Sequence, residues 1–197
     1  MDPDAAYPGP QRDEPVAIEL HNTVYAVKGS VRDGLADAAS AVAWLDGLAG
    51  RLPEGDGGSR AWPSARDLVV LREAVRAALQ AAVHGGVPDR AALDVINRAS
   101  SRAPQSTIAL WRADAEPAAA TDYHGARRPD IVISALAVDA IDLLTGPRRD
   151  DLRACGAPGC VLMFLKDHPR REWCSNSCGN RARQARHYRR TRGQAPS

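Results

Sequence analysis

The chain has 197 residues, of which 44% are hydrophobic and 25% are charged, and its formal net charge is +2. A chain of this length and composition can bury one good-sized core and hold a small additional module. No apolar run reaches the roughly 18 residues of a membrane span, and the acidic, proline-rich start lacks the features of a secretion signal. We therefore expect a cytoplasmic protein without a membrane partner.

The first ordered segment is expected to begin at Val16, because residues 1–15 are rich in Pro, Gly and Asp and predict a disordered tail. This segment contains two adjacent polar residues, His21 and Asn22, which are the candidate ligand site of the N-terminal region. The alternative is that Asn22 caps a helix or satisfies a buried turn.

Four amphipathic helices are predicted between residues 30 and 147 from the spacing of apolar residues. Ser64 is a good N-cap, and glycines or prolines stand where helices should stop. The first helix is expected to start at residues 30–33 and to stop near Gly47, and the second to start at Ser64 and to stop at residues 84–86. The third is expected to start at Pro88, with no clear stop, and the fourth to run from Pro129 to Gly146.

Between the third and fourth helices, residues 106–112 and 118–123 predict two short strands joined as a hairpin. Three tryptophans, Trp44, Trp62 and Trp111, are expected in the core or at a domain interface. The fold class predicted for residues 16–147 is therefore mainly α with a small β-hairpin element. Residues 148–151 predict a hinge before the next module.

All four cysteines of the chain lie in its last quarter, with the spacing C-x4-C-x13-C-x3-C: Cys155, Cys160, Cys174 and Cys178. Paired thiols at short spacing are typical of a closed tetrahedral zinc site. Glycines and a proline inside the first pair supply the bends of a metal-binding knuckle. Residues 161–165 and 171–173 predict a hairpin, and Ser175 is a candidate N-cap for a helix. The module is therefore expected to be a treble-clef-like finger.

Two disulfides and an iron–sulfur cluster of a redox sensor are the alternatives to zinc. A reducing cytoplasm disfavours disulfides. The site has no water-bearing ligand position and no neighbouring general base, and the chain contains no glycine-rich phosphate loop and no G-x-S-x-G motif. We therefore expect a structural Zn²⁺ ion in a protein that is not an enzyme.

The segment after Cys178 predicts a basic helix. Helical phase places Ala182 and Ala185 on the same face as Cys178, toward the finger. The remaining cationic residues are predicted to face outward or to lie on the flank, where they could bind nucleic acid: Arg181, Arg183, Arg186, His187, Arg190 and Arg192. Arg is suited to phosphates and guanine edges because its planar fork makes bidentate hydrogen bonds. The alternative is a solvated Arg-rich terminus.

Charge is distributed unevenly along the chain. From Cys155 onward nine Lys and Arg stand against two Asp and Glu, a net charge of +7, whereas the preceding part has 17 basic and 22 acidic residues, a net charge of −5. This division is typical of a regulatory or scaffold domain joined to a nucleic-acid contact module.

The cysteine module resembles the bacterial CGNR-type zinc finger, whose tetrapeptide is present intact as residues 178–181. Residues 20–24, 33–35 and 71–76 resemble the ABATE domain that precedes this finger, a family described as stress-induced transcriptional regulators. The resemblance implies an ABATE-like domain over 16–147, a finger with its basic helix over 148–192, and a second disordered tail over 193–197.

Together these observations predict a zinc-dependent DNA-binding transcriptional regulator. A single finger offers a small footprint, so a homodimer or a transcription-machinery partner such as RNA polymerase is expected. The main rival is a protein-interaction module in which zinc stabilises a docking surface and no DNA is bound.

Overall fold

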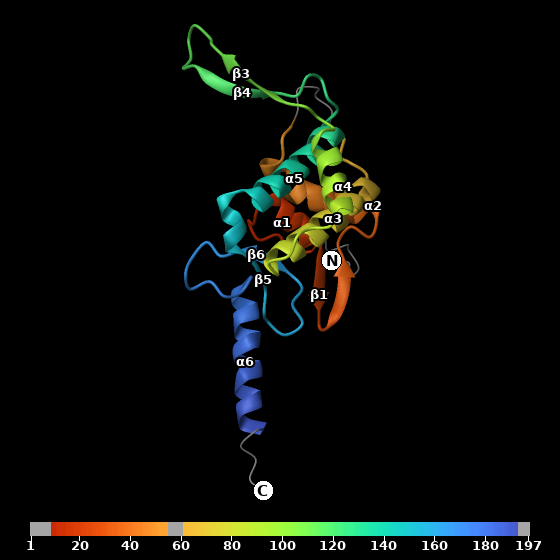
Figure 1. Ribbon diagram of the computed structural model, residues 1–197. Helices are drawn as coiled ribbons and strands as arrows, with labels where there is room; N and C mark the ends of the chain where they lie inside the picture. The colour runs from red at the N-terminus through yellow and green to blue at the C-terminus, as the bar shows by residue number, and fades with distance from the viewer. Residues whose placement is uncertain (1–8, 55–60, 193–197) are drawn as a thin grey trace, which may run out of the picture.

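A computed structural model describes residues 9–54 and 61–192 (Figure 1). The predicted tails at residues 1–8 and 193–197 lie outside the described residues. No helix in the described ranges is long and apolar enough to cross a membrane. The fold class is as predicted: a mainly helical body, small antiparallel hairpins and a C-terminal module that gathers the four cysteines.

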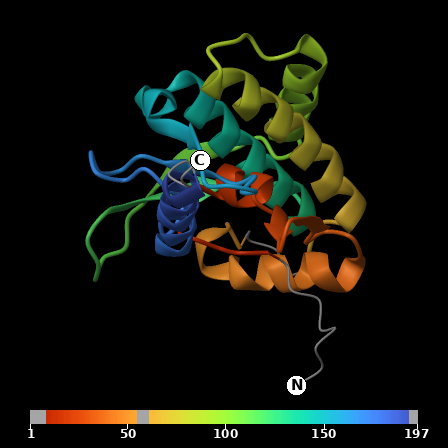
Figure 2. The same cartoon turned by 90° about the horizontal axis from the view of Figure 1, so that it is seen from below.

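The body is built from α-helices whose apolar faces meet in one core. Figure 2 shows the short helix α1 enclosed among α2, α3 and α5, and Ala17, Ile18 and Leu20 of α1 are fully buried. Helix α4 packs against α3 and α5. The bounds are α1 Val16–His21, α2 Ala38–Gly47, α3 Ala65–Val83, α4 Arg90–Ser100 and α5 Arg128–Thr145, with a short 3-10 helix η1 over Ala49–Arg51.

Local sequence signals fix several helix ends. The hydroxyl of Ser64 accepts the Asp67 N–H at 3.1 Å, as predicted for the N-cap of α3. The carboxylate of Asp89 accepts the Ala91 N–H at 3.0 Å at the start of α4. Helix α5 has a proline in its first turn and ends at Gly146.

Two antiparallel hairpins extend the body. Strands β3 Ser106–Leu110 and β4 Ala118–Asp122 form the predicted hairpin, which projects from the helices (Figure 1). Strands β1 Val24–Val27 and β2 Ser30–Asp33 form one that the sequence analysis missed, since it assigned residues 30–33 to a helix start. Lys28 and Gly29 both have positive φ, which suits the two-residue turn between twisted strands.

The finger contains a hairpin, but its strands differ from those predicted. Strand β5 Leu152–Ala154 pairs with β6 Met163–Leu165 across the cysteine knuckle, and residues 171–173 form no strand. The predicted pairing fails because side chains from the N-terminal domain bond to the backbone of Met163 and Leu165. The predicted hinge is a 3-10 turn, η2 Pro147–Asp151, and the basic helix is α6 Asn176–Arg192.

Two sequence expectations about burial are wrong. The disordered tail predicted over residues 1–15 does not include residues 9–15, because the Gln11 side chain donates to the Trp44 carbonyl and Glu14 is only 3% exposed. Trp44 lies in the core and Trp62 is half-buried under Arg128, as expected. Trp111, however, is 79% exposed, since it follows the projecting strand β3.

Candidate metal centre and basic helix

The four cysteines converge on one point, with all of their sulfur atoms within 4.8 Å of one another. The Sγ atoms of Cys174 and Cys178 are 3.4 Å apart, and Cys160 lies 3.8 Å from each. A tetrahedral ion with metal–sulfur bonds of 2.3 Å would hold its ligands about 3.8 Å apart. The donor set therefore fits a single tetrahedral metal ion, and all four cysteines are free rather than bridged by disulfides.

Three of the four cysteines are positioned by short structural elements. Cys155 follows β5, where its N–H donates to the Leu162 carbonyl at 2.9 Å, and Cys160 closes the knuckle by donating to Ala157 at 3.0 Å. Gly159 has φ of +70°, a conformation that glycine adopts without strain. Cys178 lies in the first turn of α6, where the Ser175 hydroxyl accepts its N–H at 3.2 Å, as the predicted N-cap.

Clustering shifts the ionisation of these thiols in opposite directions. Hydrogen bonds from Cys160 and Cys174 lower the pKa of Cys155. Hydrogen bonds to Cys155 and Cys160, together with burial, raise the pKa of Cys174. The four sulfurs therefore cannot all carry negative charge side by side unless a cation compensates them.

Two residues of the CGNR motif contact the sulfur cluster, and the other two shape the first turns of α6 around it. Cys178 is a candidate ligand, and the Arg181 guanidinium donates to its sulfur at 3.2 Å. A Cβ on Gly179 would lie 2.9 Å from the Trp173 ring, so only glycine lets the indole pack against the helix. Asn180 accepts a hydrogen bond from Arg183 at 2.5 Å. Arg181, predicted to bind nucleic acid, is thus engaged at the thiolate cluster.

Beyond this first turn, α6 extends away from the body (Figure 1). Ala182 is 5% exposed and Ala185 is half-buried, which confirms the predicted inward face. The predicted outward residues Arg183, Arg186, His187 and Arg190 are all exposed. The side chains of Arg186, His187 and Arg190 make no hydrogen bond or ion pair with other described residues, although the His187 carbonyl accepts the Thr191 hydroxyl at 3.3 Å. The sequence of the helix contains six arginines and no acidic residue.

Arg192, the last residue predicted to bind nucleic acid, ends α6, and its side chain lies outside the described ones. Sequence reasoning missed Arg189, which is also exposed and which the Arg-rich run could have included. A groove of about 920 Å³ beside the start of α6 was also not predicted from the sequence. Arg12, Arg170 and Arg183 line this groove, together with acidic residues Asp13, Asp167 and Glu172. No local signal joins Arg12 to the finger.

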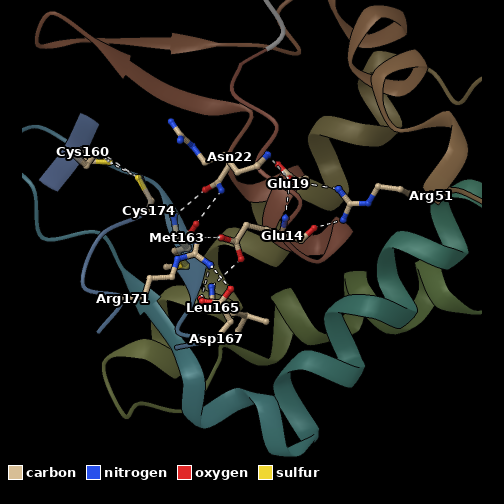
Figure 3. A network of polar contacts seen from close by, with 12 residues as sticks. Glu14, Glu19, Asn22, Arg51, Cys160, Met163, Leu165, Asp167, Arg171 and Cys174 are labelled. Carbon is tan, nitrogen blue, oxygen red and sulfur yellow. Dashed lines mark hydrogen bonds and ion pairs between the residues drawn. The ribbon is translucent and has the colours of Figure 1, made fainter. Parts of the chain in front are cut away.

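The finger is docked on the N-terminal domain by a buried polar network (Figure 3). The Asn22 side chain donates to the Met163 carbonyl at 3.0 Å and accepts the Met163 N–H at 2.9 Å, as a neighbouring strand would. Glu14 accepts the Leu165 N–H at 2.9 Å and forms an ion pair with Arg171. The orientation of the finger, and therefore of α6, is set by these contacts.

The ligand site predicted at His21 and Asn22 stays a prediction, and both side chains are buried. His21 is 0% and Asn22 1% exposed, and the Asn22 amide is used by Met163. The alternative reading of Asn22, as a residue that satisfies buried backbone, is the one observed. Burial, reinforced by the charge of Arg76, lowers the pKa of His21 from 6.5 to about 4.

Asn22→Ala should lower the free energy of unfolding by about 2–4 kcal/mol, because it leaves the buried N–H and C=O of Met163 without partners. Urea denaturation with excess metal measures this. Asn97→Ala, at an exposed site on α4, should change stability by no more than about 0.5 kcal/mol. Equal stabilities of the two variants would show that the Asn22 bonds do not hold the finger.

The buried neutral His21 should make the fold acid-sensitive. Because its pKa is lower in the folded than in the unfolded chain, the unfolded chain binds the extra proton first, and stability is lost as pH falls from 6.5 toward 4. Between about pH 7.5 and pH 5.5 this loss amounts to about 1.4 kcal/mol. His21→Gln should reduce the measured pH dependence by that amount, whereas an unchanged pH dependence would contradict the shift.

The helical body and the four-cysteine centre define the class of the protein: a helical domain joined to a C-terminal metal-binding finger. Residues 14–147 match the family model of ABATE, described as "Putative stress-induced transcription regulator", and residues 152–191 match the CGNR zinc finger. Since the first match spans well over half of the chain, the chain belongs to the ABATE family. A comparison with curated proteins gives no match.

Proposed function

We propose that the protein is a zinc-dependent, DNA-binding transcription regulator of the bacterial cytoplasm. The observation that supports this most is the exposed cationic surface of α6, whose first turn is fixed by the cysteine cluster. The description of the matched family points in the same direction. In this proposal a stress signal reaches the N-terminal domain, and the finger presents α6 to DNA.

Zinc is the ion that best suits the donor set. Four thiolates at tetrahedral spacing match its preference for sulfur ligands in structural sites. An iron–sulfur cluster would place several iron and sulfide atoms between the cysteines and hold their sulfurs farther apart than 4.8 Å. All four donors are cysteines, which leaves no ligand position for water or substrate, so the proposed role of the ion is structural rather than catalytic.

An α-helix fits the major groove of B-DNA, and α6 presents its cations there without competition from acidic side chains of its own. The side chains of Arg186, His187 and Arg190 have no intramolecular partners among the described residues, so binding need not break existing ion pairs. The groove beside Arg183 has arginines and acidic residues among its lining, so its charge is mixed and the proposal relies on α6 itself. One finger covers a short site, so the proposal includes a second copy or RNA polymerase.

A salt-titrated DNA-binding assay on the zinc-loaded chain tests the proposal. If four to six basic groups neutralise phosphates, log K should fall with log salt at a slope of roughly −4 to −5. Fluorescence anisotropy with a labelled duplex from a random-sequence pool measures the slope, and sequencing of the retained duplexes gives the site. Absent or salt-insensitive binding would refute the DNA-binding role.

A second candidate function is a zinc-stabilised protein-interaction module. It is favoured by Tyr188, which is 57% exposed on α6, because exposed aromatic residues are frequent anchors of protein interfaces. In that case α6 would bind an acidic protein partner, and the same assay would show no DNA binding.

A further inference from the structure

The β3–β4 hairpin projects from the helical body (Figure 1) and carries exposed apolar side chains. Ile108 is 38% exposed, Leu110 41% and Trp111 79%. A two-stranded hairpin is marginally stable in water unless a further strand or helix covers it. The two strands are covered by neither in the described part of the chain, so they leave an apolar surface open for a partner.

The composition of the hairpin restricts that partner. Asp122 is the one charged residue in the two strands, so the strands offer few ion pairs to a nucleic acid or to a strongly charged protein. The strands also contain no Lys and no Pro, the residues that commonly protect an exposed edge from pairing. The surface is therefore suited to an uncharged, apolar partner.

The shape of one face of the hairpin is complementary to itself. Successive side chains of a strand alternate between faces, so Ile108 and Leu110 share a face with their cross-strand partners Ala120 and Ala118. The two large apolar side chains of this face, Ile108 and Leu110, lie on β3 and face alanines on β4, whereas Ser106 and Asp122 occupy the end of the same face next to α4 and α5. The face thus has a ridge along one strand and a shallow groove along the other.

A two-fold axis parallel to the strands would place the ridge of one copy in the groove of the other. Leu110 would then lie over Ala118 of the second copy, and Ile108 over its Ala120. An isologous contact of this kind uses the same surface twice. We propose that this face of the β3–β4 hairpin is the dimer interface between two copies of the chain.

Two adjacent alanines provide a matched test, because both are exposed and belong to β4 but lie on opposite faces. Ala118→Arg would bury two unpaired cations in each dimer and should weaken dimerisation at least about 100-fold. Ala119→Arg adds the same charge to the other face and should change the dissociation constant by less than about 3-fold. Sedimentation velocity on the full, metal-loaded chain measures both, and circular dichroism verifies that each variant is folded.

The expected result is a wild-type dimer, a dimeric Ala119→Arg variant and a monomeric Ala118→Arg variant. A wild-type chain that stays monomeric up to about 100 µM would overturn the proposal, because the Ala118→Arg variant would then have no dimer to weaken. Equal dissociation constants for the two variants would also overturn it, because the dimer would then use another surface. Neither outcome depends on DNA binding, so the test is independent of the proposed function.

Discussion

Removal of the metal should unfold the finger and detach the start of α6. The apolar cluster around the cysteines is small: Ala157, Leu162 and Phe164 of the finger, with Tyr25 of strand β1 packed against them. Binding of zinc to such modules contributes on the order of 10–16 kcal/mol at neutral pH. A chelator of matching affinity should therefore abolish the folded finger, with a loss of helical circular dichroism and release of one zinc per chain.

Helix α6 is expected to lose much of its order with the metal. Beyond Ala182 its described side chains are exposed apart from the half-buried Ala185, so tertiary packing stabilises it little. A helix of this length without tertiary support depends on a fixed first turn to avoid the cost of nucleation. Cys174 and Cys178 would fix that turn when they hold a metal ion, and the Ser175 hydroxyl caps it by accepting the Cys178 N–H.

A pair of substitutions in the same helical turn separates metal loss from a general effect of mutation. Cys178→Ser should abolish stoichiometric zinc binding and reproduce the chelated state, whereas Ser177→Ala, at an exposed neighbouring position, should bind zinc as the wild type does. Metal analysis and a cobalt-substituted absorption spectrum report occupancy and tetrahedral sulfur coordination. A chain that contains no bound metal, or a finger that stays folded after chelation, would contradict the assignment.

The features predicted correctly from the sequence are those that depend on short stretches of chain. The cysteine spacing indicated the metal centre, and the Ser64 and Ser175 caps indicated where helices begin. Helical phase alone separated the inward Ala182 from the outward arginines. In each case the interacting residues are close together in the sequence, so the pattern can be recognised without knowledge of the tertiary fold.

The features that were missed depend on residues far apart in the chain. Glu14 stands in a segment that composition assigns to a tail, yet it bonds to Leu165, 151 residues away. Asn22 is separated from Met163 by 141 residues. Its amide bonds to the N–H and C=O of Met163, with which the predicted strand over residues 171–173 was expected to pair. Such contacts have no periodicity in the sequence, so the orientation of the finger could not be predicted.

Replacing Arg183, Arg186 and Arg190 together by alanine should reduce DNA affinity about 100- to 1,000-fold at low salt. Each arginine that contacts a phosphate contributes about one unit to the salt dependence, so the slope should become less negative by about 3. The loss should be similar for most sequences if the contacts are to phosphates. It should be larger for the selected site if an arginine also contacts a guanine edge. Anisotropy titrations at several salt concentrations measure both quantities.

The matched control removes the same charge from two other helices. Arg66, Arg90 and Arg98 are exposed on α3 and α4, away from α6, and their replacement by alanine lowers the net charge equally. If the affinity depends on the geometry of α6, the control should keep a slope within about one unit of wild type. If it depends on net charge alone, the two triple variants should lose affinity alike, and α6 would not be the DNA-binding element. The cysteine centre would then orient α6 toward a protein partner.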